Sequence, residues 1–246
     1  IISALNGLPD IERSLSRLAS ARGGPRYLSA IARALSLGRD ISVRLSAQVS
    51  EAQGIDEHAP DIMMLIEDTQ CAADLADSLM PALADDMPLL ARDGNFIRAG
   101  YDSSLDQIRQ LRDESRRLIA GLQADYAAQT DISSLKIKHN NVLGYHIEVR
   151  SLHGDKLMSD NQFIHRQTTA QAVRFTTTEL ADMEKQMASA SDRALAVELA
   201  LFETLVKQVL ARSPALEQTA AALAALDVAT ASAQLASSRY YCRPIM

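Results

Sequence analysis

The 246-residue sequence contains no tryptophan, and aromatic residues make up only 4% of it. Few aromatic side chains, together with abundant alanine and leucine, favour packed helices over a β-sandwich. Cys71 and Cys242 lie too far apart for a metal or redox motif, which indicates reduced thiols in a cytoplasmic protein. No apolar run approaches the roughly 18 residues of a membrane span, and the first residues do not form a signal peptide. We therefore expect a mainly α-helical protein without a membrane partner.

The sequence also lacks the motifs of an enzyme. No G-x-x-x-x-G-K-[ST] phosphate-binding loop occurs, so we expect no ATP site in this chain. Four of the five histidines fall within residues 139–165, but their spacing matches no zinc module and no cysteine lies near them. We predict no catalytic residues, no metal site and no bound cofactor. Because the sequence does not begin with methionine, we also expect it to be a fragment of a longer chain.

Apolar periodicity predicts several short helices in the first hundred residues, separated by glycine and proline. These helices are expected to open at Pro9 and to cover 26–37, 39–52 and 60–79. The prolines of residues 81–100 predict mostly loop with a short hairpin.

Two much longer helical patterns follow. Residues 102–129 carry apolar side chains mainly at gaps of 3, 4 or 7, with Leu111 and Leu118 among them. A second stripe, in steps of 3 or 4, runs through residues 178–212. At 1.5 Å per residue these helices would be about 40 and 50 Å long. We expect them to lie against each other as an antiparallel pair.

The ends of the second long helix are also marked in the sequence. Thr176 stands three residues ahead of Glu179, which is the signature of a capping box. Pro214 begins a third helix, rich in alanine and serine, that allows neighbouring backbones to approach closely.

Residues 133–178, between the two long helices, alternate polar and apolar side chains and predict a small antiparallel sheet. The predicted strands cover 135–138, 144–149 and 162–168, with turns at Asn140-Asn141 and at 153–155.

This insert carries six basic and three acidic side chains, a formal charge of +3, whereas the rest of a chain of net charge −6 carries −9. A basic tip on an acidic protein is a plausible footprint for phosphate. An ordinary solvated sheet face would produce the same imbalance.

Several segments, in order, closely resemble the MutS family of DNA mismatch-repair proteins. They are LPDIERSLSRLA (8–19), RDGNFIRAGYDSSLDQIRQL (92–111), LGYHIEV (143–149), HRQTTAQAVRFTTTEL (165–180) and RALAVELALFETL (193–205). The resemblance extends over essentially the whole chain.

The resemblance implies a mainly α fold with a helical core, two long antiparallel lever helices and a small inserted antiparallel β-sheet clamp. It assigns 1–132 to the core and first lever, 133–178 to the clamp, and 179–246 to the second lever and the return to the core. The clamp of this family rests on the backbone of duplex DNA. The mismatch-reading domain and the ATPase domain, with its ATP and Mg, would lie outside this chain, which is therefore not expected to be an enzyme.

The resemblance also implies which residues contact the DNA backbone. The family's Arg-Gln-Thr segment matches Arg166, Gln167 and Thr168, and Arg174 follows it. Where many relatives carry a Lys-Asn pair, this chain has Ala170 and Gln171, so one phosphate-binding charge is missing. The remaining candidates lie on the neighbouring strand and turn: Lys136, Lys138 and Asn141.

We therefore predict a lever and clamp module that holds duplex DNA without reading its sequence. The full-length protein is expected to be a homodimer that works with other mismatch-repair proteins in the bacterial cytoplasm, associated with the nucleoid. The alternative is a helical protein-interaction rod whose sheet docks another protein and binds no DNA.

Overall fold

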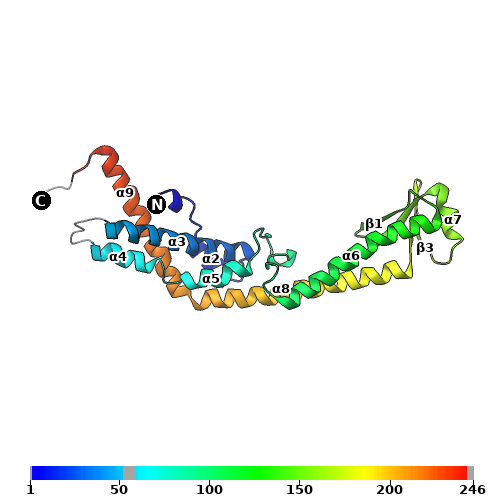
Figure 1. Cartoon of the computed structure of the whole chain (residues 1–246), viewed down its shortest axis with the longest axis horizontal. Coiled ribbons are helices and arrows are strands. Elements are labelled where there is room, and N and C mark those ends of the chain that lie inside the picture. The colour runs from blue at the N-terminus through cyan, green and yellow to red at the C-terminus, as the bar shows by residue number, and fades with distance from the viewer. Residues whose placement is uncertain (1, 52–58, 243–246) are drawn as a thin grey trace. The chain divides into compact units, whose positions relative to one another are not determined.

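The computed structural model describes residues 2–51 and 59–242 (Figure 1). Two compact units are present, one made by residues up to Tyr101 together with those from Glu198 onward, the other by Asp102–Val197. The fold is mainly α with a small antiparallel sheet, as predicted, and this sheet has four strands. The elements are α1 (Ile2–Leu5), α2 (Ile11–Ala19), α3 (Pro25–Glu51), α4 (Ala59–Asp68), α5 (Ala73–Ala82), η1 (Ala91–Asp93), α6 (Ser103–Thr130), β1 (Lys136–Asn140), β2 (Gly144–Arg150), η2 (Ser151–His153), α7 (Gly154–Met158), β3 (Ile164–Thr168), β4 (Ala172–Thr176), α8 (Thr178–Ala211) and α9 (Ser213–Arg239).

Helix α3 is continuous, so the prediction of separate helices over 26–37 and 39–52 was wrong within the described residues; residues 52–58 lie outside them. Gly38 does not end the helix. A Cβ at Gly38 would lie 3.4 Å from the carbonyl oxygen of Thr69 and 3.6 Å from a methyl group of Leu223. This glycine therefore lets α4 and α9 pack closely against α3, instead of stopping it.

The predicted helix over 60–79 is instead two helices, α4 and α5. The chain turns at Thr69, whose buried hydroxyl donates to the carbonyl of Ile66 at 2.7 Å. Helix α5 continues through Pro81, and no hairpin forms in the described residues 81–100. A single antiparallel bridge between Leu83 and Ile97 takes its place.

Helix α9 is long and apolar enough to cross a membrane by length and composition, with an 18-residue window of mean hydropathy 1.3. The longest uninterrupted apolar run in α9 is only Ala220–Leu226, so α9 meets the criterion by its average hydropathy and not by an apolar run of the length considered in the sequence. Its apolar character comes largely from alanine, and 22% of that window is buried within the protein. Leu216, Leu223 and Leu226 are buried in the part of α9 that packs in the helical unit.

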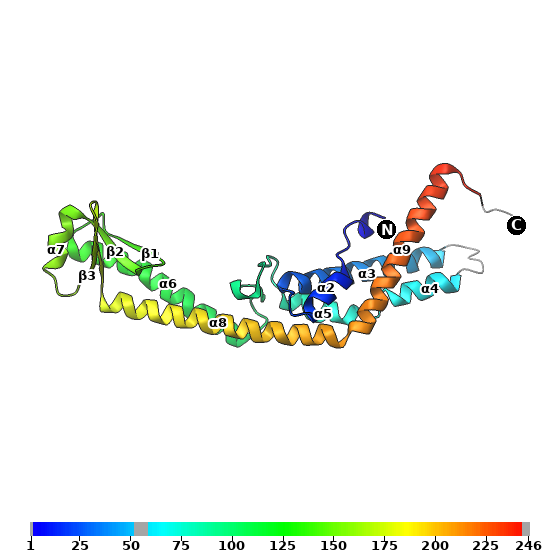
Figure 2. The same ribbon diagram turned by 180° about the vertical axis from the view of Figure 1, so that it is seen from behind.

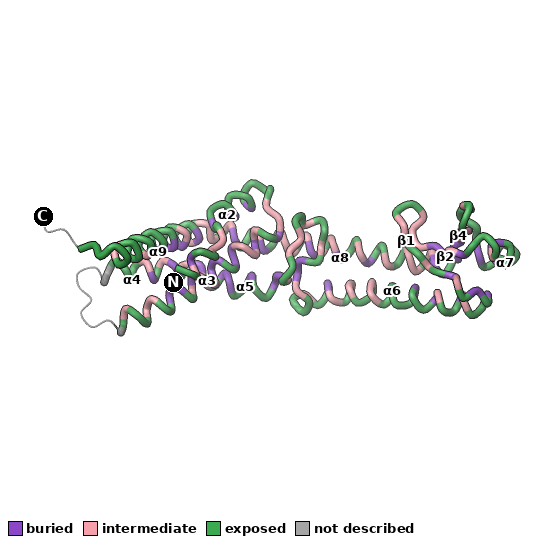
Figure 3. The backbone as a smooth tube through the Cα atoms, turned by 90° about the horizontal axis from the view of Figure 1, so that it is seen from above, coloured by how far each residue is buried: buried purple, intermediate pink, exposed green. Residues whose placement is uncertain are grey.

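In the other unit, α6 and the first part of α8 run antiparallel, side by side in Figure 3. Their predicted packing along one continuous stripe was wrong in the middle of α6, where Leu111 and Leu118 are 44% and 58% exposed. The buried positions of α6 lie instead mostly toward its C-terminal end and include Ile119, Leu122 and Tyr126. The two helices are thus held together mainly at the end that carries the sheet.

The capping box predicted from Thr176 and Glu179 is not formed. Thr176 belongs to β4, and α8 is capped by Thr177, whose Oγ1 accepts from the amide of Leu180 at 3.0 Å. The carboxylate of Glu179 instead accepts from the hydroxyl of Tyr126.

The sheet has the strand order β1-β2-β4-β3 and lies where α6 ends and α8 begins (Figure 2). The three predicted strands are present, and β4 is an additional strand that was not predicted. The turn predicted at 153–155 is instead the end of η2 and the start of α7. One face of the sheet packs on α6, α7 and α8 through a core that includes Ile147, Val149, Phe163, Val173 and Phe175.

Candidate nucleic-acid interface

The two faces of the sheet differ sharply in composition. On the inner face Ile147, Val149, Val173 and Phe175 are at most 4% exposed. Because side chains alternate along a strand, the residues between them project from the opposite, outer face. These outer-face residues include Lys136, Lys138, Glu148, Arg150 and Arg174.

A row of polar side chains crosses the middle of the outer face. Lys136 pairs with Glu148, Glu148 pairs with Arg174, and Arg174 pairs with Gln167 in the strand register. Neighbouring strands lie about 4.8 Å apart, so this row is roughly 14 Å wide. Three of the predicted DNA-backbone residues are thereby brought into one line.

Glu148 is the acceptor at the centre of this row. Its Oε1 accepts from Lys138 Nζ at 2.6 Å, and its Oε2 accepts from Arg174 Nε at 3.1 Å. The hydrogen bond from Lys138 lowers the pKa of Glu148 below its usual 4.5, burial opposes that shift, and Arg174 adds to it. Arg174 also donates from Nη1 to the side-chain oxygen of Gln167 at 2.8 Å. Lys138, Arg174 and Gln167 are therefore already engaged within the sheet.

Arg166 lies at an irregularity of the sheet edge. The register of β3 against β4 shifts between His165 and Gln167, which leaves Arg166 without a partner position on β4. Its side chain is exposed, and within the described part of the chain neither Arg166 nor Lys136 forms an ion pair. A bulge of this kind re-aims a side chain at a sheet edge, and here the side chain is a cation.

The remaining predicted residues do not join the row. Thr168 pairs in register with Val173 of the inner-face set, and its hydroxyl is 2.8 Å from Nε2 of His165. Asn141 follows β1, at the end of β2 that begins with Gly144, whereas Gln171 precedes β4 at the opposite end. At 3.3 Å per residue these two turns are about 20 Å apart, so one compact site does not include both.

Two outer-face residues were missed as candidates. Arg150 is exposed on β2 beside Ala172, and Glu148 lies on the same strand two residues earlier. The alternation of GYHIEVR already places both side chains on one face. The pairing of Glu148 with two cations depends on the strand order, which the sequence alone does not reveal.

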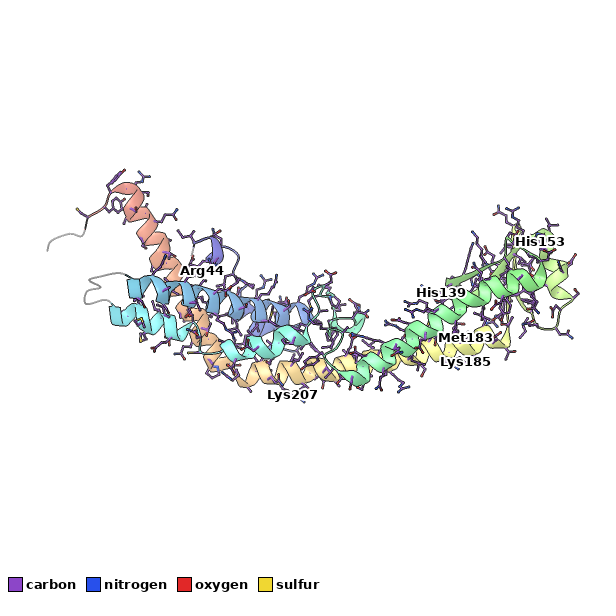
Figure 4. The ribbon with its side chains drawn as sticks, viewed as in Figure 1. Arg44, His139, His153, Met183, Lys185 and Lys207 are labelled. Atoms are coloured by element: carbon purple, nitrogen blue, oxygen red, sulfur yellow. The ribbon has the colours of Figure 1, made fainter. Side chains whose placement is uncertain are left out.

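The sheet is fixed to both long helices by polar contacts at its base. The buried hydroxyl of Tyr126, in α6, lies 2.9 Å from Thr177 Oγ1 and donates to Glu179 Oε2 at 3.0 Å. Burial is the main cause of a raised pKa for Tyr126. The side chain of Met183, labelled in Figure 4, packs against the apolar core from α8.

Helix α8 also contacts the start of β2 directly. Glu184 Oε1 accepts from the backbone amide of Tyr145 at 3.0 Å. Gly144 adopts a positive φ of 69°, and a Cβ there would lie 2.0 Å from the same oxygen. The absence of a side chain at Gly144 is what lets this carboxylate reach the strand.

The arginines of α6 have a different environment. Arg109 lies 3.8 Å from Asp106, and Arg112 lies 3.1 Å from Asp113. These contacts make the surface around them a mixed-charge one, as is common along the exposed side of a long helix.

Comparisons with known proteins agree with this architecture. Residues 100–193 match the model of MutS family domain IV, nearly the same residues as the sheet-bearing unit. The chain is 47% identical over 244 residues to the DNA mismatch repair protein MutS of Bartonella tribocorum, covering 98% of this chain and 26% of that protein. The corresponding protein of Bartonella henselae is 47% identical over 249 residues, with the same coverage. The chain thus spans about a quarter of the length of these relatives.

Proposed function

This chain belongs to the MutS family of DNA mismatch-repair proteins, and from that membership we propose that residues 133–178 act as a clamp on duplex DNA. The observation that carries the proposal is the outer face of the sheet. Lys136 and Arg150 are exposed on that face, Arg166 is exposed at the bulge of the edge strand β3, and the inner face packs in the apolar core. Cations on a rigid surface bind the phosphate backbone without reading bases.

We further propose that α6 and α8 act as levers. Helix α8 is 34 residues long, begins at the sheet and continues into the helical unit. Rotation of such a helix at one end would move the sheet at the other, because Glu184 and the apolar core fix the sheet to it. In the full-length protein this movement would couple DNA binding to an ATPase domain outside this chain.

The remaining parts of the proposal concern the full-length protein. It would bind ATP and Mg in that other domain, form a homodimer, cooperate with further repair proteins and act in the bacterial cytoplasm. The chain itself would be neither an enzyme nor a cofactor-binding protein.

Salt dependence tests the DNA-binding proposal. Binding of the purified chain to a fluorescent duplex of about 30 base pairs, measured by anisotropy, should weaken with salt at a log–log slope of about −2 to −5. Matched and mismatched duplexes should bind equally, since the outer face reads no bases. A flat salt response, or no binding at low salt, would favour the protein-interaction rod instead.

Substitution of two cations tests the surface itself. Arg150→Ala combined with Arg166→Ala should weaken binding about 10- to 30-fold at low salt and make the slope shallower by about 2. The matched control, Arg33→Ala with Arg44→Ala, removes the same charge from exposed positions of α3 (Arg44 is labelled in Figure 4) and should change affinity less than about threefold. Equal losses in both double variants would mean that only net charge matters and that the sheet is not the binding surface.

A further inference from the structure

The four strands contain five lysine and arginine residues but only one acidic residue, Glu148. It lies on β2, which is a central strand of the sheet. Both carboxylate oxygens are used, one for each of two cations, Lys138 and Arg174. The Glu148 side chain is only 17% exposed, whereas that of Lys138 is 50% exposed. The single negative charge is thus set below the surface formed by its partners.

We propose that Glu148 competes with DNA phosphates for the positive charges of Lys138 and Arg174. It thereby limits how tightly this sheet binds the DNA backbone. The inference rests on the proposed function. Lys138 and Arg174 keep further N–H donors, but the carboxylate neutralises part of their positive charge, so each cation attracts a phosphate less strongly than an unpaired one would. The carboxylate also repels an approaching phosphate directly, because like charges within several ångströms disfavour each other.

Two of the five strand cations are held in this way, and the other three are Lys136, Arg150 and Arg166. Only three of the five positive charges on the strands are therefore left unpaired by Glu148 and fully available to DNA phosphates. Binding through so few charges is weak and readily reversed. This suits a surface that must bind DNA of any sequence and then release it.

A purely structural role for Glu148 predicts a different outcome. Cross-strand ion pairs at a partly exposed surface stabilise a sheet only weakly, and the apolar core on the other face does most of the stabilising. If Glu148 served only to orient Lys138 and Arg174 for DNA, its removal would weaken binding. If it served only the fold, its removal would leave the DNA affinity of the folded protein unchanged.

The test is Glu148→Gln, which keeps the shape of the side chain and removes its charge. DNA affinity of the 246-residue chain at 50 mM salt should rise about tenfold, and the log–log salt slope should become steeper by about 1–2. The matched control is Asp155→Asn, at an exposed position of α7, which makes the same change in net charge outside the row. It should raise affinity less than about twofold.

The outcomes separate the two proposals. No DNA binding by the unaltered chain would overturn the clamp proposal, and the role of Glu148 with it. Binding by the unaltered chain with equal effects of Glu148→Gln and Asp155→Asn, or with weaker binding by Glu148→Gln, would overturn the inference about Glu148 alone. Glu148→Thr provides a second variant that removes the carboxylate with a residue well suited to a strand, and circular dichroism confirms that each variant is folded.

Discussion

Gly144 offers a sharp test of how the sheet is attached to α8. Replacing it with alanine places a Cβ 2.0 Å from Glu184 Oε1 and 2.7 Å from its Cδ. Glu184 can swing away because its carboxylate is the end of a flexible side chain. That movement breaks its bond to the amide of Tyr145, which is otherwise 3.0 Å long.

The expected cost has two parts. Alanine at a φ of 69° is strained by about 1–2 kcal/mol. Loss of a hydrogen bond to a charged acceptor adds about 1.5–3 kcal/mol. The lower conformational entropy of alanine in the unfolded chain returns about 0.5–1 kcal/mol. The net destabilisation of the β1–β2 hairpin should therefore be about 2–4 kcal/mol.

The two compact units need not unfold together, so a global unfolding curve would not isolate the hairpin. Hydrogen exchange measured by mass spectrometry gives the exchange rates of the hairpin amides themselves. Amides of residues 136–150 should exchange about 30- to 700-fold faster in Gly144→Ala. Gly121→Ala is the control, since a Cβ at Gly121 meets nothing within 4 Å and alanine favours the helix. It should leave exchange in the hairpin unchanged.

A double-substitution cycle tests the cause. Because Gly144→Ala already breaks the bond to Glu184, adding Glu184→Ala should cost less than about 0.5 kcal/mol more, although Glu184→Ala alone should cost about 1–3 kcal/mol. Additive effects, or hairpin exchange in Gly144→Ala within threefold of the unaltered chain, would refute the attachment described here.

Two further predictions concern the base and the surface of the sheet. Tyr126→Phe removes a buried hydroxyl shared by Thr177 and Glu179 and should destabilise the sheet-bearing unit by about 1–3 kcal/mol, measured by exchange of its slowest amides. Because the pKa of Glu148 is lowered from 4.5 in the folded state, its stabilising contribution is present above pH 4.5 and is lost as pH falls through the lower folded-state value. Acid titration followed by circular dichroism should therefore show a smaller loss of stability below pH 4.5 in Glu148→Gln than in the unaltered chain, and an equal loss in both would contradict this assignment.

The long helices could be predicted because few structures other than an α-helix keep apolar residues at a 3.6-residue period over many turns. The period did not reveal which stripe is buried, as the exposed Leu111 and Leu118 show. Gly38 was misassigned because a glycine that ends a helix and one that admits a neighbouring helix look alike in sequence. The strand β4 was missed because its residues run directly into the start of α8.

Within the candidate site, the residue types could be predicted but their grouping could not. Lys138 and Arg174 are 36 positions apart, and their shared partner Glu148 follows from the order β1-β2-β4-β3. Asn141 and Gln171 were grouped with them by resemblance, whereas they lie at opposite ends of the sheet. Register and strand order are set by pairing between residues far apart in the sequence. The alternation of polar and apolar residues along one strand predicts neither of them.

The side-chain oxygens of Tyr126, before the first strand, and Thr177, after the last strand, lie 2.9 Å apart. The chain therefore enters and leaves the sheet segment at neighbouring points. A short glycine-serine linker could join the two helices there with little loop-closure entropy, and a small domain that replaces the segment would have to supply the apolar face that α6 and α8 now pack against.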